Sequence, residues 1–497
     1  MRSSIFTALL LVFSFSGINA QKLTEKQEIT GTFGSGDYAP MWHMSNRQGL
    51  VSDEKSSAFT RLGIGGEHKF SKTGIALNWE FDFAVGMNLA STIFVQQAYI
   101  DINWKKVQLS VGQKERWQGV VNHRLSSGSL TESGNARPVP QIRFELPDYW
   151  NIPKLGGWLG IKGHIAYGIF TDGNWQKDFA APGTEYTKNV LYHSKSGFMR
   201  IGNEEKFPLT AELGLHMVTQ FGGTTYNYDN VPGATLKSPT RPKDFWTAFF
   251  PTSGDEAYDI GDQANVAGNM LGSWMGAISW NEKDWKLRAY YEHTFEDHSQ
   301  MFMEYGIWTE QLVGLELELR NFKWIKGIAI EYFNLKNQCG PIYHDTSSAI
   351  PDQISCRDDN YNHGKYLGWF NYGQIIGTPL CTSPIYNKDR NIICYNNRVE
   401  AFHIGVEGSP LEWLDYRMLL TRSNNWGTYE NPFKDIKKNT SGLFELTFKP
   451  KALENWSITT SFAFDNGDLY DNNNGCMISV KRFGIIDFND IKKLFNK

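Results

Sequence analysis

Apolar and polar residues alternate along almost the whole chain after residue 20, and this alternation limits the chain to strands whose two faces meet different surroundings. In the segment 75–83, apolar residues at the odd positions alternate with Asn78, Glu80 and Asp82. The same pattern recurs in the segments 285–292, 315–320 and 456–465. Sandwiches of two sheets show it too, so single strands do not separate a sandwich from a barrel.

The connections between these segments favour a barrel. The predicted short links are Asn103 to Lys106, Gly202 to Pro208, Asn281 to Asp284, Phe322 to Trp324, Ser409 to Trp413 and Pro450 to Asn455. The predicted long links are Lys114 to Pro140, Thr171 to Lys188, Gly222 to Gly268, Thr294 to Ile307, Lys336 to Asn397 and Asn424 to Asn439. Short turns on one rim and long loops on the other are typical of outer-membrane barrels, in which the long loops face outward.

We therefore predict an all-β fold, a transmembrane antiparallel barrel of about 18 strands of roughly ten residues each, occupying residues 21–483. An even number of strands places both termini in the periplasm. Mean hydropathy is −0.42, and no run of eighteen apolar residues offers a spanning helix. The 17 Trp, 22 Tyr and 32 Phe suit aromatic girdles at the two membrane surfaces, and no linker divides the chain.

The N-terminus predicts export. Met1 and Arg2 precede an apolar run from Ile5 to Phe15 and a small-residue exit that ends at Ala20, so residues 1–20 are predicted to be a signal peptide cleaved after Ala20. No cysteine follows that could accept a lipid anchor. The expected location is the outer membrane of a Gram-negative bacterium, in contact with lipid and lipopolysaccharide.

At the other end, Phe483 is predicted to finish the last strand. The barrel assembly machinery is expected as a partner during biogenesis, because it reads a terminal aromatic strand. Here a polar tail, residues 484–497, follows Phe483.

Four of the five cysteines fall in one predicted external loop, where an oxidising compartment favours two disulfide bridges with three alternative pairings. These candidates are Cys339, Cys356, Cys381 and Cys394. A metal cluster is a weak alternative because no C-x-x-C pair is present, and no cofactor is expected. Cys476 lies in the last strand without a partner.

Other chemistry is weakly supported. His298 beside Asp297 and His344 beside Asp345 are adjacent only in sequence, so we predict that the protein is not an enzyme. The acidic stretch 465–475 could bind calcium but lacks the closing Glu of an EF-hand, and a hairpin loop is preferred. A net charge of −4 without a basic stripe argues against nucleic acid.

Charges of both signs are predicted to face the lumen, where they could pair and fill the bore or line a water channel. They are Glu80, Asp82, Asp101, Lys286, Arg288, Glu292, Glu316, Glu318, Arg320 and Glu445.

Two motifs are more specific. One is Ala39-Pro40-Met41-Trp42-His43-Met44-Ser45-Asn46-Arg47-Gln48-Gly49. The other runs through Val111-Gly112-Gln113-Lys114-Glu115 and Leu125-Ser126-Ser127-Gly128-Ser129-Leu130 to Ser133-Gly134-Asn135-Ala136-Arg137-Pro138-Val139-Pro140-Gln141-Ile142. With the barrel pattern around them, the chain resembles the Wzi-type capsule assembly proteins, in the form common among Bacteroidetes. The resemblance implies an eighteen-stranded, non-catalytic lectin that attaches exported capsular polysaccharide to the cell surface.

The chemistry of sugar recognition suggests the contact residues, since sugars stack on aromatic rings and their hydroxyls bind amide and guanidinium groups. The candidates are Trp42, His43, Asn46, Arg47, Arg116, Trp117, His123, Arg124, Asn135, Arg137, Trp175, Tyr226, Tyr228, Trp246, Tyr366 and Trp369. Trp175 and Trp369 are favoured as exposed rings, whereas Asn135 and Arg137 could equally brace the barrel.

The leading hypothesis is therefore a surface lectin for capsular polysaccharide or exopolysaccharide. The alternative is a diffusion pore for saccharides or other polar solutes.

Overall fold

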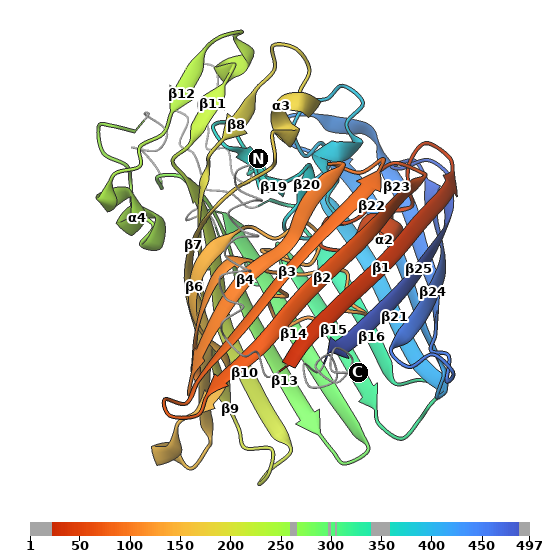
Figure 1. Ribbon diagram of the computed structural model, residues 1–497. Coiled ribbons are helices and arrows are strands. Elements are labelled where there is room, and N and C mark those ends of the chain that lie inside the picture. Colours follow the sequence, from red (N-terminus) through yellow and green to blue (C-terminus); the bar gives the residue numbers. More distant parts are fainter. Residues whose placement is uncertain (1–21, 259–265, 297–299, 304–305, 339–357, 487–497) are drawn as a thin grey trace, which may run out of the picture.

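The computed structural model describes residues 22–258, 266–296, 300–303, 306–338 and 358–486, in which eighteen strands form one closed sheet (Figure 1). Every barrel strand pairs with its neighbours along the chain in antiparallel register, and β1 pairs with β25 to close the ring. The predicted barrel of about 18 strands is confirmed. The predicted signal peptide, residues 1–20, lies outside the described residues.

The strands of the barrel are β1 (Lys22–Ser35), β2 (Ser57–Phe70), β3 (Ile75–Met87), β4 (Ile93–Trp104), β5 (Val107–Gln113), β6 (Gln141–Asn151), β7 (Leu159–Ile169), β9 (Leu191–Ile201), β10 (Leu209–Phe221), β13 (Asn269–Asn281), β14 (Trp285–Glu296), β15 (Gln311–Leu319), β16 (Gly327–Asn334), β21 (Val399–Leu411), β22 (Leu414–Gly427), β23 (Pro432–Phe448), β24 (Trp456–Gly467) and β25 (Asn473–Ile486).

The remaining elements are short and lie in the connections. They are α2 (Met41–Met44), η2 (Pro153–Leu155), α3 (Trp175–Phe179), β8 (Tyr186–Lys188), β11 (Thr224–Tyr226), η3 (Tyr228–Asn230), β12 (Thr235–Lys237), α4 (Pro242–Phe249), β17 (Asn362–His363), β18 (Leu367–Gly368), β19 (Phe370–Asn371), β20 (Gln374–Ile375) and η4 (Pro384–Tyr386). Strands β8, β11 and β12 form a separate small sheet above the barrel (Figure 1). Among the described residues no helix has the length and apolar character needed to cross a membrane.

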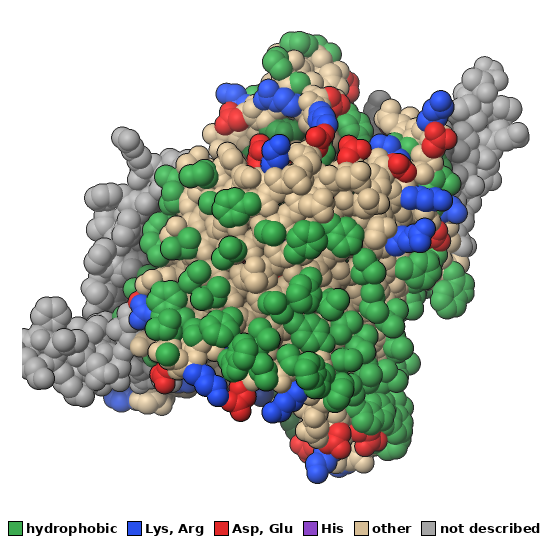
Figure 2. Space-filling view, turned by 90° about the vertical axis from the view of Figure 1, so that its right-hand side faces the viewer, with side chains coloured by type: hydrophobic (Ala, Val, Ile, Leu, Met, Phe, Trp, Pro, Cys, Tyr) green, Lys and Arg blue, Asp and Glu red, His purple; other side chains and the backbone are tan. Residues whose placement is uncertain are grey.

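The alternation of side chains sets the two faces of the wall. Asp82, Glu292 and Ser461 point into the lumen and are at most 4% exposed, whereas Phe144 and Leu315 point outward. Figure 2 shows apolar side chains across the middle of the outer wall and charged ones gathered toward its two rims. The closed sheet pairs the backbone N–H and C=O groups of its strands with one another. The apolar outer face can therefore lie against hydrocarbon without leaving polar backbone groups unpaired.

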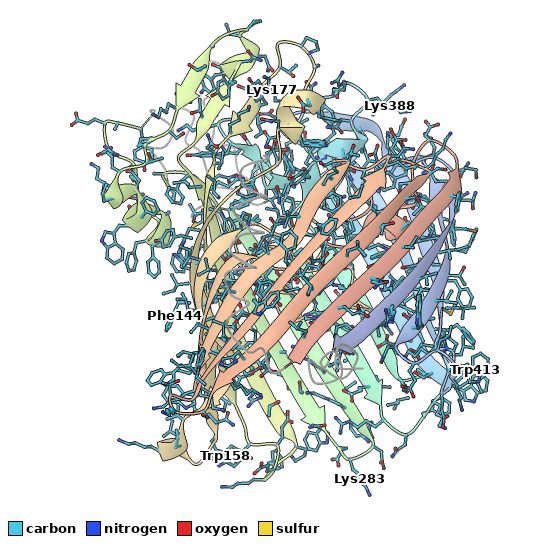
Figure 3. The ribbon with its side chains drawn as sticks, in the orientation of Figure 1. Phe144, Trp158, Lys177, Lys283, Lys388 and Trp413 are labelled. Carbon is cyan, nitrogen blue, oxygen red and sulfur yellow. The ribbon has the colours of Figure 1, made fainter. Side chains whose placement is uncertain are left out.

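The two rims differ, as predicted. One, the short-turn end, carries the links β2–β3, β4–β5, β6–β7, β9–β10, β13–β14, β15–β16, β21–β22 and β23–β24. Trp158, Lys283 and Trp413 mark this end in Figure 3, and Lys177 and Lys388 mark the opposite, long-loop end. All six predicted short links fall at the short-turn end.

One predicted long loop is wrong. Residues 424–439 belong mainly to strands β22 and β23, which are joined by a tight turn at 428–431. The polar residues that suggested a loop, such as the fully buried Asn425, instead face the lumen. A polar lumen removes the composition contrast that separates strands from loops in soluble proteins.

The end of the barrel also differs from the prediction. Strand β25 continues three residues past Phe483 to Ile486, pairing with β1 as far as Leu23. Arg482, just before this extension, forms an ion pair with Glu25 of β1 at 2.7 Å. Part of the expected tail is therefore strand, and residues 487–497 lie outside the described residues.

The connection 114–140, which we call the strap, folds into the barrel and runs across the lumen. It packs so closely on the inner wall that a Cβ atom at Gly405 of β21 would clash with the carbonyl oxygen of Leu125. His403, two residues earlier on the same inward face, forms a 2.7 Å hydrogen bond through Nε2 with that same oxygen. Glycine at position 405 thus permits the close approach.

We expect Gly405→Ala to destabilise the barrel by about 1–3 kcal/mol, the usual cost of overpacking, by pushing the strap off the wall. The unfolding temperature from heat-modified migration on gels would measure this effect. Gly197→Ala is the matched control, because nothing lies within 4 Å of a Cβ at that strand position. Equal unfolding temperatures for the two variants would contradict the close-packing explanation.

Candidate functional site

Carboxylates on the barrel wall hold the strap. The carboxylate of Glu292 accepts hydrogen bonds from the Ser129 hydroxyl at 2.8 Å and the Leu130 amide at 2.9 Å. The carboxylate of Glu331 accepts from the amide and hydroxyl of Ser127 at 2.7 and 2.6 Å. Because a buried carboxylate is costly without donors, these bonds fix the path of the strap through the lumen.

The connection 36–56 also folds inward, and its helix α2 lies against β23 and β24. The carboxylate of Asp465 accepts the Met41 amide at 2.9 Å, at the start of this helix. Trp42 donates through its indole nitrogen to the Thr421 hydroxyl at 3.2 Å, and His43 Nε2 lies 3.1 Å from the Ser461 hydroxyl. Trp42 and His43 are thus fixed inside the barrel.

Asn135 and Arg137 brace the two inward connections. The Asn135 side chain accepts from the Asn46 amide at 3.3 Å and donates to the Ile375 carbonyl at 2.8 Å. The Arg137 guanidinium lies between the rings of Phe94 and Tyr372, 3.7 and 3.9 Å from their centroids. Burial lowers the pKa of Arg137 to about 10. Asn135 and Arg137 were predicted either to contact sugar or to brace the barrel, and their contacts among the described residues are those of a brace.

Six of the predicted residues meet at a cavity of about 430 Å³ in the lumen, which we call the first cavity. They are Trp42, Asn46, Arg47, Trp117, His123 and Arg124. Its walls come from the halves of β22, β23 and β24 nearest the short-turn end, from the middle of β1 and β25, and from Phe59 and Arg61 of β2. His123 and Arg124 are exposed there. The plugging connections therefore occupy the long-loop half of the lumen and leave space below them.

A second cavity of about 310 Å³ adjoins the first, and Trp117 lines both. The Trp117 ring stacks on His123, with centroids 5.1 Å apart and planes 15° from parallel. Glycine at position 134 leaves room for the Trp117 ring, because a Cβ atom there would clash with the indole. The strap thus presents a flat aromatic platform between two polar cavities.

Charges in the first cavity are matched. Arg61 Nε binds the Asp82 carboxylate at 2.7 and 2.8 Å, and its Nη2 reaches Glu115 at 2.8 Å. Arg47 and Arg417 share Glu445, at 3.3 and 3.0 Å. The remaining cations of this cavity also have partners, Arg124 with Glu407 at 2.6 Å and Lys481 with Glu28 at 3.1 Å.

The aromatic residues that were predicted to be exposed sugar contacts are buried in the structure. Trp369 is 0% exposed, Tyr366 2% and Trp175 8%, because the segment 358–398 folds over the strap and buries them. Trp175 stacks on Phe179 inside this packing. The prediction that Trp175 and Trp369 are open to a sugar is wrong, since a long loop can form its own apolar core.

The other predicted residues are dispersed. Arg116 lines the second cavity. Tyr226 stacks on Tyr186 in the small sheet above the barrel, and Tyr228 follows it in η3. Trp246 is 65% exposed on α4.

The cysteines depart from the predicted bridges. Cys381 and Cys394 are free thiols in the interior of segment 358–398, and burial raises the pKa of both. The buried Cys381 thiol donates a weak hydrogen bond to the Asn397 carbonyl oxygen at 3.7 Å. Cys339 and Cys356 lie outside the described residues. Cys476, which was predicted to be unpaired, is a free and exposed thiol.

The predicted calcium stretch is a hairpin, β24 and β25 joined at 468–472, in which Asp465 binds α2 rather than an open site. No group of metal-ligating side chains occurs within the described ranges. The pairs Asp297 with His298 and His344 with Asp345 fall outside those ranges.

A histidine and serine cluster in the lumen has the composition of a catalytic triad but not its geometry. His216 Nε2 faces both the Ser194 hydroxyl at 3.2 Å and the Glu132 carboxylate at 3.0 Å, whereas its Nδ1 has no hydrogen-bond partner among the described residues. A triad needs serine and carboxylate on opposite ring nitrogens. This cluster joins the strap to β9 and β10.

Several of the residues that line the cavities were not identified as site residues from the sequence. Arg61, Arg143, Lys162 and Arg417 lie on inward positions of their strands and line the two cavities. The period-two pattern marks such positions as lumen-facing. It does not say which of them border empty space and which border the strap.

The closed eighteen-stranded sheet, apolar outer wall and charged lumen define an outer-membrane-type β-barrel, here filled in its long-loop half by its own connections. Among solved structures, the chain is similar to Wzi of Escherichia coli, described as an outer membrane protein involved in group 1 capsule assembly and a carbohydrate-binding β-barrel. The TM-score is 0.56 at 12% identity, covering 95% of this chain and 86% of that one.

Two further structures are similar at lower scores. OccAB4 of Acinetobacter baumannii has a TM-score of 0.47 at 9% identity and covers 94% of this chain and 99% of its own. OprD of Pseudomonas aeruginosa has a TM-score of 0.47 at 8% identity, with coverages of 94% and 98%. No family model matches the sequence, and no curated protein matches it.

The buried His43 makes the inward packing of residues 36–56 sensitive to acid. Burial lowers the pKa of His43 from 6.5 to about 3, so the folded loop holds it neutral. Its stabilising contribution is complete above about pH 6.5 and is lost as the pH falls toward 3. At about pH 5 we expect opening of residues 36–56 to become easier by about 2 kcal/mol.

Hydrogen exchange of these residues, corrected for intrinsic rates, measures the change. His43→Gln keeps a hydrogen-bonding side chain without the titration, so this variant should lose the His43 share of the pH response. An identical pH response in both proteins would show that other groups cause it.

Proposed function

We propose that the protein is a non-catalytic polysaccharide-binding barrel of the Gram-negative outer membrane that attaches capsular polysaccharide or exopolysaccharide to the cell surface. Its long-loop end faces outward, its wall contacts lipid and lipopolysaccharide, and the barrel assembly machinery inserts it. One observation carries the proposal: the stacked pair Trp117 and His123 stands between two polar cavities inside a lumen crossed by the strap.

The chemistry of this place suits a saccharide. An aromatic face packs on the C–H side of a sugar ring, while surrounding guanidinium, amide and hydroxyl groups bind its hydroxyls. Arg47, Asn46 and Ser126 provide such groups within the first cavity. The motif resemblance agrees with this reading, whereas the likeness to Wzi is a likeness of fold.

A diffusion pore is the second candidate, favoured by the polar cavities in the short-turn half of the lumen. The strap and the connection 36–56 argue against it, because their carboxylate-held backbones lie across the path. A steady channel would require these hydrogen bonds to break.

The host test deletes the gene and measures how surface polysaccharide divides between washed cells and medium. We expect polymer to be made but to shift into the medium, and the wild-type gene to restore it to the cells. Trp117→Ala should restore less than half of the cell-bound polymer, since stacking on one aromatic ring contributes about 1 kcal/mol or more. Trp117→Tyr, which keeps a ring, should restore most of it.

Purified protein in a planar bilayer separates the two candidates. A silent membrane together with polymer release from the deletion strain supports the anchor. A steady open conductance with polymer retained on the deleted cells would reject the anchor in favour of the pore.

A further inference from the structure

The second cavity differs from the first in its charge balance. Its lining carries four cationic side chains, Lys114, Arg116, Arg143 and Lys162, and one carboxylate, that of Glu145. Lys114 pairs with Asp101 at 2.5 Å and Arg143 with Glu145 at 2.6 Å. Among the described residues, neither Arg116 nor Lys162 has a carboxylate oxygen within 4.0 Å.

These two cations are held by neutral groups. Arg116 donates to the Ser110 hydroxyl at 2.7 Å and to the Lys114 carbonyl at 3.3 Å. The Lys162 ammonium lies over the rings of Tyr149 and Phe198, 4.7 and 4.9 Å from their centroids. Burial and the neighbouring Arg143 lower the pKa of Arg116 to about 10. Carboxylates act on these cations only at longer range, Glu145 and Asp101 on Arg116 and Glu212 and Asp148 on Lys162. Positive charge without a direct carboxylate contact favours an anion brought by a ligand.

Size and position indicate what carries the anion. A volume of about 310 Å³ lies at the lower end of the range for small-molecule sites. The cavity shares Trp117 with the first cavity, so a chain that stacks on this ring can extend into both. Guanidinium and ammonium groups match the geometry and charge of a sugar carboxylate.

We propose that the second cavity is an acidic subsite that binds the carboxylate of a uronic acid unit through Arg116 and Lys162, beside a sugar stacked on Trp117. This inference rests on the proposed function and narrows its ligand to an acidic polysaccharide. The cations of the first cavity do not suit this role, because each already has a carboxylate partner.

Calorimetry on the full chain in detergent tests the proposal with tetragalacturonic acid and its methyl ester. The acid should bind more tightly than the ester, and added salt should reduce the difference. Lys162→Gln should weaken binding of the acid about tenfold, as expected for a charged hydrogen bond, and leave the ester unchanged. Lys286→Gln is the control, because this lysine lines neither cavity and already pairs with Glu204 at 3.9 Å.

Equal affinity for acid and ester, with no effect of Lys162→Gln, would overturn the acidic subsite while leaving saccharide binding intact. Inorganic phosphate binding as tightly as the oligosaccharide would assign the cavity to a small free anion and also overturn it. If neither oligosaccharide binds and Trp117→Ala retains polymer on cells, the proposed function fails together with the subsite.

A separate observation concerns the outer wall. Nine tryptophans among the described residues are more than a third exposed, and seven of them ring the short-turn end: Trp104, Trp150, Trp158, Trp280, Trp285, Trp324 and Trp413. The other two, Trp246 and Trp308, lie on long connections. The aromatic girdle is thus built from strand ends and turns on one side and from loops on the other.

Both connections fold onto the outer face of the wall. In α4, the Phe245 carbonyl accepts from the Tyr167 hydroxyl at 2.8 Å and the Ala248 carbonyl from the Thr219 hydroxyl at 3.2 Å. The Lys195 ammonium on the outer face of β9 donates to the carbonyl at Phe249. The helix thereby covers polar groups that would otherwise face lipid, which is costly.

The second connection does the same over β13 and β14. The Trp274 indole donates to the Met301 carbonyl at 2.8 Å, and His293 Nδ1 lies 2.9 Å from the Thr309 carbonyl. Outward from these anchors, Phe302 is 74% exposed and Trp308 67%, while on α4 Trp246 is 65% exposed. These exposed rings extend the apolar outer surface of the wall.

We infer that α4 and residues 300–303 and 306–309 lie in the lipid layer at its outer boundary, with Trp246 and Trp308 at headgroup depth. The occupant of this surface is lipid, because the surface is continuous with the lipid-facing wall and interfacial Trp is favoured at that level. Trp246 accordingly serves as a membrane contact.

The test places a fluorophore at Trp246→Cys in a background in which Cys339, Cys356 and Cys476 are replaced by serine, reconstituted in phosphatidylcholine vesicles with brominated acyl chains. Lipid bromine should quench it, most strongly when placed near the headgroup. Lys237→Cys, on the small sheet above the barrel, is the matched position and should be quenched by aqueous iodide only. Quenching of position 246 by iodide alone, or its burial by a second copy in cross-linking, would overturn the inference.

Discussion

The carboxylates of Glu292 and Glu331 on the inner wall fix the arrangement of the lumen. Each accepts several hydrogen bonds from the strap, including backbone amides, and these bonds form only when the strap crosses the bore. Charged hydrogen bonds of this kind contribute about 1.5–3 kcal/mol each, and an unpaired buried carboxylate costs more. The cavities, the Trp117 platform and the closed long-loop half all follow from that placement.

The two cavities differ in how their cationic side chains are paired. In the first, arginines and lysines pair with wall carboxylates, which stiffens the lumen and leaves little net attraction for an anion. In the second, Arg116 and Lys162 rest on hydroxyl, carbonyl and aromatic groups. Adjacent regions of one lumen can therefore serve different parts of a polymer, neutral stacking at Trp117 and charge recognition beside it.

The outer surface has a different constraint, because unpaired charges and unpaired backbone groups are costly in lipid. Lys195 and His293 lie on the outer face, and the connections that cover them supply carbonyl acceptors. One set of connections thus fills the lumen, and another protects the wall. Loop length can be read from the sequence, but it does not indicate whether a loop fills the lumen or covers the outer wall.

The sequence by itself determined the closed barrel, its strand number and the six short turns, because alternation with a period of two is a local consequence of facing lipid on one side and the lumen on the other. It also named Trp117 and Arg124 as candidate sugar contacts. Only the tertiary structure decided that Trp369 is buried, that Trp246 faces outward, that 428–431 is a tight turn and that Lys162 lines a cavity. Those facts depend on contacts between residues distant in sequence, for which no local pattern carries a signal.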